Sequence, residues 1–210
     1  MNPAMRSSLL MFGNYCGLGY LAALLLGWAL LAGFLPPWSP MESAAEVAAK
    51  YQEPIFIRIG MVVVMYSAMI FVPFGGTVAY FISRVEDGFG MLTCAAILGC
   101  AATMVLTFYP AIWWLVAAFR PERAPELIQL FNDLAWLQFI GGVSIYETLL
   151  LSVALAAFCD TSDQPVFPRW SGYVNIMIVV GFFPGQLIFF FRSGPFAWNG
   201  VFGLWIPVFL

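Results

Sequence analysis

The chain has 210 residues, of which 62% are hydrophobic and only 9% are charged, and its formal net charge is −3. An average soluble domain carries about 25% charged residues, so this composition excludes a water-soluble globular protein. The absence of histidine from the sequence also excludes His-ligated metal or haem centres and a Ser-His-Asp triad within this chain.

Long apolar runs are the main structural signal in the sequence. A run of more than about 18 residues is long enough to cross about 30 Å of hydrocarbon as a helix. The first run covers residues 9–35, which is too long for the core of a signal peptide, so we expect an uncleaved first span. Both faces of every long run are apolar, which excludes the alternating strands of a β-barrel.

A short helix is expected after the first span. Ser39 followed by Pro40 is typical of a helix N-cap with proline at the first helical position. The following segment, 41–51, mixes apolar and charged residues, and Glu46 and Lys50 are spaced as an i,i+4 pair. This pattern predicts a helix that lies on the membrane surface.

The next two runs predict the second and third spans, at about 59–83 and 89–119. Pro73 lies inside the second run and Pro110 inside the third. Proline removes a backbone hydrogen bond within a helix, so we expect each of them to kink or break its span. The turn between the two runs is short, which requires the two helices to be antiparallel neighbours.

The C-terminal part of the sequence contains three further apolar runs. The fourth helix is expected over 126–158, and the fifth over 172–191 with a kink or break at Pro184. The last stretch, 201–210, provides only about 15 Å of helix, or half a bilayer. We expect either a half-span held against its neighbours or, as the favoured alternative, a sequence that stops before the natural end of the protein.

These runs predict an all-α fold, a polytopic transmembrane bundle of about six spans that forms one integral membrane domain over residues 1–210. Its expected partners are membrane lipids and other membrane protein chains, in a homo- or hetero-oligomer. No nucleic acid is expected, because the sequence has no basic cluster. The C-terminal half resembles bacterial membrane proteins of unassigned function in three segments, Arg120-Pro-Glu-Arg, Asn132-Asp133-Leu-Ala-Trp136 and Pro195-Phe-Ala-Trp198-Asn-Gly. This resemblance favours the bacterial inner membrane and implies no activity.

The fourth predicted helix is the only span with acidic residues well inside it. Asp133 and Glu147 are separated by nearly four turns at about 3.6 residues per turn, so a continuous helix places both on one face, together with Gln129 and Ser144. An ionisable group at bilayer depth costs about 3 kcal/mol, so it usually faces the protein interior. We therefore expect these four residues to be candidates for binding a ligand or a proton, with Glu147 neutral at physiological pH.

A structural interpretation of the same residues remains open. Asp133 can lie near the interface and bond to an arginine such as Arg120 or Arg58, and Glu147 can bond to a neighbouring helix. Arg58 precedes the second span, where it either extends to the lipid headgroups or pairs with Asp133 or Glu147. Arg58 is therefore the fifth candidate residue.

Two classes of function are favoured. The first is a protein that binds or permits the passage of a small hydrophobic or weakly polar solute. In one form of this function, binding is linked to a proton through the acidic stripe, which is the face formed by Gln129, Asp133, Ser144 and Glu147. The second is a non-catalytic accessory subunit of a larger membrane complex. An intramembrane enzyme is disfavoured, because no catalytic motif is present, and no cofactor is indicated. The aromatic run 182–191 either faces lipid or lines a site for a flat ligand such as a sterol, quinone or carotenoid.

Overall fold

The computed structural model describes residues 2–209, and all regular secondary structure in that range is helical, as predicted. Within it, five helical segments are long and apolar enough to cross a membrane, in agreement with a transmembrane bundle. They are Pro3–Leu31, Ile55–Val85, Met91–Phe119, Pro125–Cys159 and Arg169–Phe189. The last apolar run forms only η3 (Val201–Trp205) and α8 (Ile206–Phe209), which together are too short to cross a bilayer.

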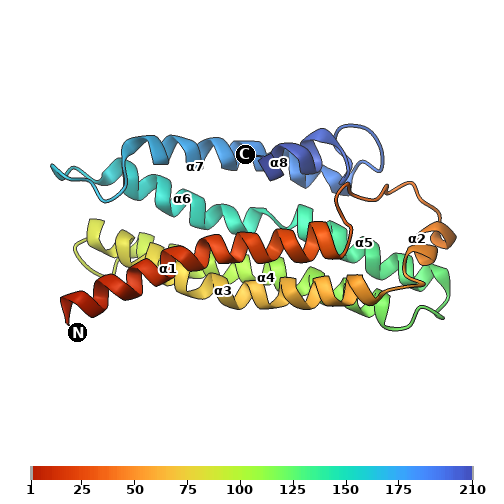
Figure 1. Cartoon of the computed structure of the whole chain (residues 1–210). Helices are drawn as coiled ribbons and strands as arrows, with labels where there is room; N and C mark the ends of the chain where they lie inside the picture. The colour runs from red at the N-terminus through yellow and green to blue at the C-terminus, as the bar shows by residue number, and fades with distance from the viewer. Residues whose placement is uncertain (1, 210) are drawn as a thin grey trace.

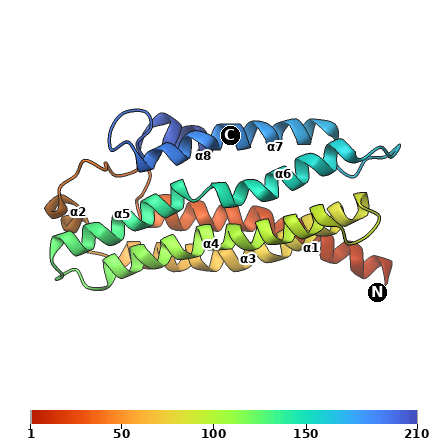
Figure 2. The ribbon, with the colours of Figure 1, turned by 180° about the vertical axis from the view of Figure 1, so that it is seen from behind.

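The spans lie side by side along a common axis (Figure 1, Figure 2). Helix α1 (Pro3–Leu24) packs on α3 (Ile55–Val85), and α3 packs on the antiparallel α4 (Met91–Phe119). On the other side of α4, α6 (Ser144–Cys159) packs on α4, and α7 (Arg169–Phe182) packs on α6. In the view of Figure 1, α1 lies in front of α4 and between α6 and α3, and α8 returns to about the middle of the bundle.

The short helix after the first span is present, but its predicted start is wrong. Helix α2 is Ala44–Lys50, and its N-cap is Ser43 instead of Ser39. The Ser43 hydroxyl accepts a hydrogen bond from the Glu46 N–H, and the Glu46 carboxylate accepts one from the Ser43 N–H at 2.7 Å. This reciprocal capping box satisfies two backbone donors at once, which explains why the helix begins there.

Helix α2 also differs from the expected surface helix in its contacts. Lys50 forms its ion pair with Glu42, since the Glu46 carboxylate is engaged by the cap. Val47 and the C-cap residue Tyr51 are buried, and α2 packs against α5 (Pro125–Gly141). The helix therefore covers one end of the bundle, the end opposite the N-terminus (Figure 1).

The three prolines inside the apolar runs have different consequences. Helices α3 and α4 continue through Pro73 and Pro110. Pro184 lies where the fifth span changes from α7 to the 3-10 segment η2 (Phe183–Phe189), so the predicted break is present at this proline.

The fourth predicted helix is not continuous, which corrects the sequence prediction. Helix α5 ends at Gly141 and α6 begins at Ser144, with no proline between them. Two adjacent glycines have low helix propensity, and neither has room for a side chain. A Cβ on Gly141 would overlap the ring of Phe189, and one on Gly142 would stand 2.8 Å from Leu106. Close packing by the fifth and third spans therefore accompanies the break.

Aromatic side chains form the core at the α2 end of the bundle. Trp136 packs edge-on against Trp114 and Trp28, with ring centroids 5.2 and 5.9 Å apart, and stacks on Trp198 at 6.2 Å. Phe34 contacts both Trp114 and Trp136 and is fully buried. These rings come from the first, third and fourth spans, from the loop after the first span and from the C-terminal segment, so one cluster joins distant parts of the chain.

Glu86 caps the N-terminus of α4 from the turn that joins it to α3. Its carboxylate accepts hydrogen bonds from the Leu92 N–H at 2.9 Å and from the N–H and hydroxyl of Thr93 at 2.8 and 2.7 Å. Burial opposes ionisation of Glu86, but the three hydrogen bonds together outweigh it and lower the pKa of this carboxyl below its ordinary value.

The stability of the protein is therefore expected to fall in acid through Glu86. A carboxyl whose pKa is lowered by folding contributes stability that is fully present above its unfolded pKa of about 4.3 and is lost as pH falls through the folded value. Glu86→Gln should cost about 1–2 kcal/mol at neutral pH and weaken the acid dependence. Thermal unfolding in detergent from neutral to acid pH measures both effects, with exposed Asp163→Asn as the control. An unchanged acid dependence in Glu86→Gln would contradict this assignment.

Candidate functional site

In the structure, the four residues of the predicted acidic stripe (Gln129, Asp133, Ser144 and Glu147) are divided between two helices. Asp133 lies on α5 and Glu147 on α6, on opposite sides of the break, so the two residues do not share one continuous helix. Neither side chain lines either of the two cavities described below. Glu147 is half-buried, and its carboxylate makes no hydrogen bond or ion pair with another described residue. Its proposed roles remain predictions from the sequence.

The polar residues of α5 instead contact the segment around α2. The Tyr51 hydroxyl donates to Asn132 Oδ1 at 2.9 Å, and Asn132 Nδ2 donates to Asp133 Oδ1 at 3.3 Å. Gln129 Nε2 donates to the backbone oxygen of Glu42 at 3.1 Å. Burial, and secondarily the negative charge of Asp133, raises the pKa of Tyr51 well above its ordinary value, so Tyr51 stays a hydrogen-bond donor. Asp133 and Gln129 thus lie in a network that attaches α2 to α5.

The other two predicted residues lie apart from this network. The Arg58 guanidinium donates to the Ala118 carbonyl from Nε at 3.2 Å and from Nη2 at 2.7 Å, and to the Phe119 carbonyl at 3.2 Å. A cation that bonds the last carbonyls of a helix also interacts favourably with the helix dipole, so Arg58 caps α4. Ser144 is exposed at the start of α6.

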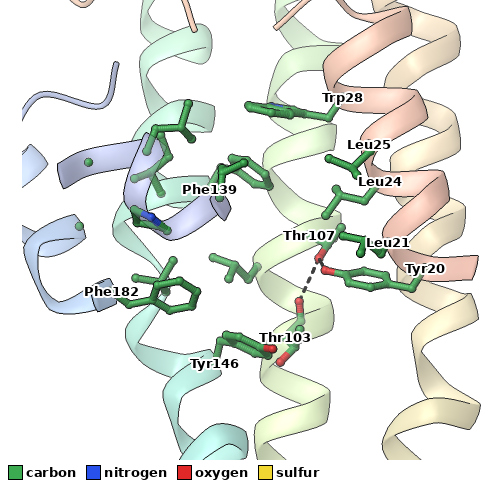
Figure 3. A pocket seen from close by; sticks show the side chains of 18 residues that line it. Tyr20, Leu21, Leu24, Leu25, Trp28, Thr103, Thr107, Phe139, Tyr146 and Phe182 are labelled. Carbon is green, nitrogen blue, oxygen red and sulfur yellow. Dashed lines mark hydrogen bonds between the residues drawn. The ribbon is translucent and has the colours of Figure 1, made fainter. Parts of the chain in front are cut away.

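A cavity of about 270 Å³ lies between the first span on one side and α5, α6, η2, η3 and α8 on the other, against α4 (Figure 3). We call it the central cavity. It is lined by Tyr20, Leu21, Leu24, Leu25, Trp28, Thr103, Leu106, Thr107, Phe139, Ile140, Val143, Tyr146, Phe182, Gly185, Gly203, Leu204, Pro207 and Val208. The lining has no charged residue and is mostly apolar, which is the chemistry of a site for an uncharged ligand.

Four irregular backbone segments meet around the central cavity. The first span is a π-helix over η1 (Leu25–Leu31), which contributes Trp28, and η3 is a second π-helix, which contributes Gly203. The break between α5 and α6 contributes Val143, and the 3-10 segment η2 contributes Gly185. Short π-helices are rare and frequent at functional sites, and irregular backbone at membrane depth occurs where it is buried in protein or lines a cavity.

Hydroxyl groups supply the polar part of the lining, near the middle of the spans. Tyr20 Oη and Thr107 Oγ1 are 3.0 Å apart, and Thr107 Oγ1 donates to the Thr103 carbonyl at 3.2 Å, as Figure 3 shows. The Thr103 hydroxyl donates to the Gly99 carbonyl at 2.8 Å. The Tyr146 hydroxyl, which comes from α6, makes no hydrogen bond with another described residue. It is therefore free to bond a ligand in the cavity.

Sequence reasoning did not identify most of these residues. Tyr20, Thr103 and Thr107 are isolated hydroxyl residues in apolar runs, and only the i,i+4 spacing of the two threonines indicates that they share a face of α4. Of the aromatic run that was considered for a flat ligand, Phe182 lines the central cavity, whereas Phe190 is 79% exposed. Most of that aromatic run therefore does not form the site.

No family model, curated protein or solved structure matches this chain. The fold itself shows an integral membrane protein, with five described helices able to span a bilayer. A more specific function has to be inferred from the central cavity.

Proposed function

We propose that the protein binds an uncharged, mostly apolar, membrane-soluble molecule in the central cavity. The observation that supports this proposal is the cavity itself, which lies near mid-span where four irregular segments meet. A continuous α-helix in lipid satisfies all of its own backbone hydrogen bonds. Several non-α segments around one cavity therefore favour a binding role over a purely structural one.

The lining restricts the chemistry of the ligand. Burying a charge without a partner is costly, so a cavity lined by uncharged residues favours a neutral molecule. The rings of Trp28, Phe139 and Phe182 favour contact with apolar or flat groups. The Tyr146 hydroxyl can donate to one carbonyl or hydroxyl oxygen of the ligand, which would fix its orientation.

The proposed binding needs no proton-linked step through Asp133 or Glu147, since neither lines the central cavity. Passage of the ligand across the membrane, residence in the bacterial inner membrane and membership of a larger complex remain predictions from the sequence. No contact within the described residues favours one of them over binding alone.

A cavity-filling substitution tests the proposal. Leu24 lines the central cavity, so Leu24→Trp should block it, whereas Leu18→Trp adds the same side chain to α1 at a position that is 67% exposed. We expect a neutral lipid-soluble compound to be extracted from wild-type protein and from Leu18→Trp, and about ten-fold less or none from Leu24→Trp, a loss of about 1.4 kcal/mol or more. Mass spectrometry of organic extracts measures the amounts. Equal amounts from both variants, or none from wild-type protein, would refute the proposal.

A further inference from the structure

A second cavity of about 490 Å³ shares one lining residue, Tyr146, with the central cavity. The second cavity is formed by α1, α3, α6 and α7 and by the loop before α7. It reaches Asn14 on α1, Val153 on α6 and Asn175 on α7. Its residues lie toward the N-terminal end of the bundle, whereas the central cavity extends toward the α2 end (Figure 1).

The two cavities together follow the membrane-spanning direction. On the first span, the second cavity reaches Asn14 and the central cavity reaches Trp28, which are about 20 Å apart at about 1.5 Å of rise per residue. This distance is about two-thirds of the hydrocarbon thickness. A compact ligand cannot occupy both ends, but an extended chain can.

The chemistry of the second cavity is also that of an uncharged chain. Its lining contains no acidic or basic residue, and aromatic and aliphatic side chains such as Phe74 and Leu149 form most of it. Asn14 and Asn175 are the amides in the lining, and Asn175 Nδ2 already donates to the Ser171 carbonyl at 2.8 Å. Tyr146, whose hydroxyl makes no hydrogen bond with another described residue, thus lines two mostly apolar cavities.

We propose that the two cavities hold one ligand, an uncharged long-chain lipid whose single oxygen-bearing group lies inside the chain, as in an ester or ketone. The carbonyl oxygen accepts a hydrogen bond from Tyr146, and one hydrocarbon arm lies in each cavity. The Tyr146 ring packs against Phe182, with centroids 6.0 Å apart, and forms the boundary that the chain passes. This inference rests on the proposed function and specifies its ligand class.

Two esters distinguish the inference from the proposed function. Ethyl decanoate has one long arm and decyl decanoate has two, and each ester carries a photoreactive diazirine at the end of every long arm. Val153→Trp fills the second cavity, and Leu155→Trp places the same ring on α6 at a position that is 47% exposed. The measurement is the concentration for half-maximal labelling of purified protein in lipid nanodiscs, with the labelled peptides mapped by mass spectrometry.

Decyl decanoate is expected to label peptides from both cavities, and Val153→Trp should weaken its labelling by about ten-fold or more, equivalent to about 1.4 kcal/mol. The same variant should leave labelling by ethyl decanoate nearly unchanged, because its single long arm can lie in the central cavity. Leu155→Trp should change labelling by neither ester. Tyr146→Phe removes the hydrogen-bond donor and should raise the concentration for half-maximal labelling about five-fold for both esters, which is the expected effect of losing one hydrogen bond.

Two results would overturn the inference while leaving the proposed function in place. In the first result, ethyl decanoate labels the wild-type protein and Leu24→Trp abolishes this labelling, but Val153→Trp does not change labelling by decyl decanoate. In the second result, all peptides labelled by decyl decanoate come from the central cavity. By contrast, the absence of saturable labelling by either ester in wild-type protein would overturn this ligand class. The extraction experiment with Leu24→Trp then decides the proposed function separately.

Discussion

Replacing Trp136 with alanine is expected to lower the free energy of unfolding by about 3–5 kcal/mol. The side chain is fully buried and contacts the rings of Trp28, Trp114 and Trp198. Lipid tails are as apolar as these rings, so the loss comes mainly from missing van der Waals contacts and the cavity left behind. Equilibrium unfolding in mixed detergent micelles, followed by circular dichroism, measures the change.

Trp170 provides the matched control for this substitution. It is 66% exposed near the start of α7, so Trp170→Ala should change the stability by about 0.5 kcal/mol or less. A Trp136→Phe variant keeps an aromatic ring in the cluster and should lose less stability than Trp136→Ala. Equal stability of Trp136→Ala and Trp170→Ala would show that the aromatic cluster does not hold the bundle together.

The second large effect is expected at Gly60, where α3 crosses η1 of the first span. A Cβ on Gly60 would overlap the carbonyl oxygen of Gly27 and stand 2.9 Å from the Ala32 nitrogen, and a Cβ on Gly27 would stand 2.5 Å from the Gly60 carbonyl oxygen. Because the obstacles are backbone atoms of both helices, Gly60→Ala should force the helices apart and cost about 1–3 kcal/mol. Thermal unfolding in detergent measures this cost.

Gly76 is the control within the same helix. A Cβ there meets no atom within 4 Å, so Gly76→Ala should be neutral or stabilising by about 0.5–1 kcal/mol, the ordinary gain of alanine over glycine in a helix. The crossing also positions η1, which carries Trp28 into the central cavity. Gly60→Ala should therefore weaken ligand binding as well. If Gly60→Ala is as stable as Gly76→Ala, the close crossing is not a constraint on the fold.

Trp28 belongs to both the aromatic core and the central cavity. It packs on Trp136 and Phe139 in the aromatic core and also lines the central cavity. The end of the cavity near α2 is therefore held rigid by the core. On the opposite wall, α8 contacts chiefly η3 and α7.

The candidate residues on the fourth span illustrate where sequence reasoning reaches its limit. Placing Asp133 and Glu147 on one face requires an uninterrupted helix, and periodicity alone cannot detect an interruption in an apolar run. The helix breaks beside Gly141, where the ring of Phe189 occupies the place of a side chain. Phe189 is far away in the sequence, so its contact is a tertiary effect. The same holds for Arg58, whose partners are two carbonyls on α4.

By itself, the sequence determined the membrane class, the all-helical architecture and the approximate spans. These properties are local, because each depends on the length of one apolar run relative to the hydrocarbon thickness. Only the tertiary structure decided where a ligand could bind. Tyr20, Thr107 and Tyr146 come from three different spans, and they line one cavity because the helices pack in a particular order with irregular segments between them. No short-range sequence pattern determines that order of helix packing.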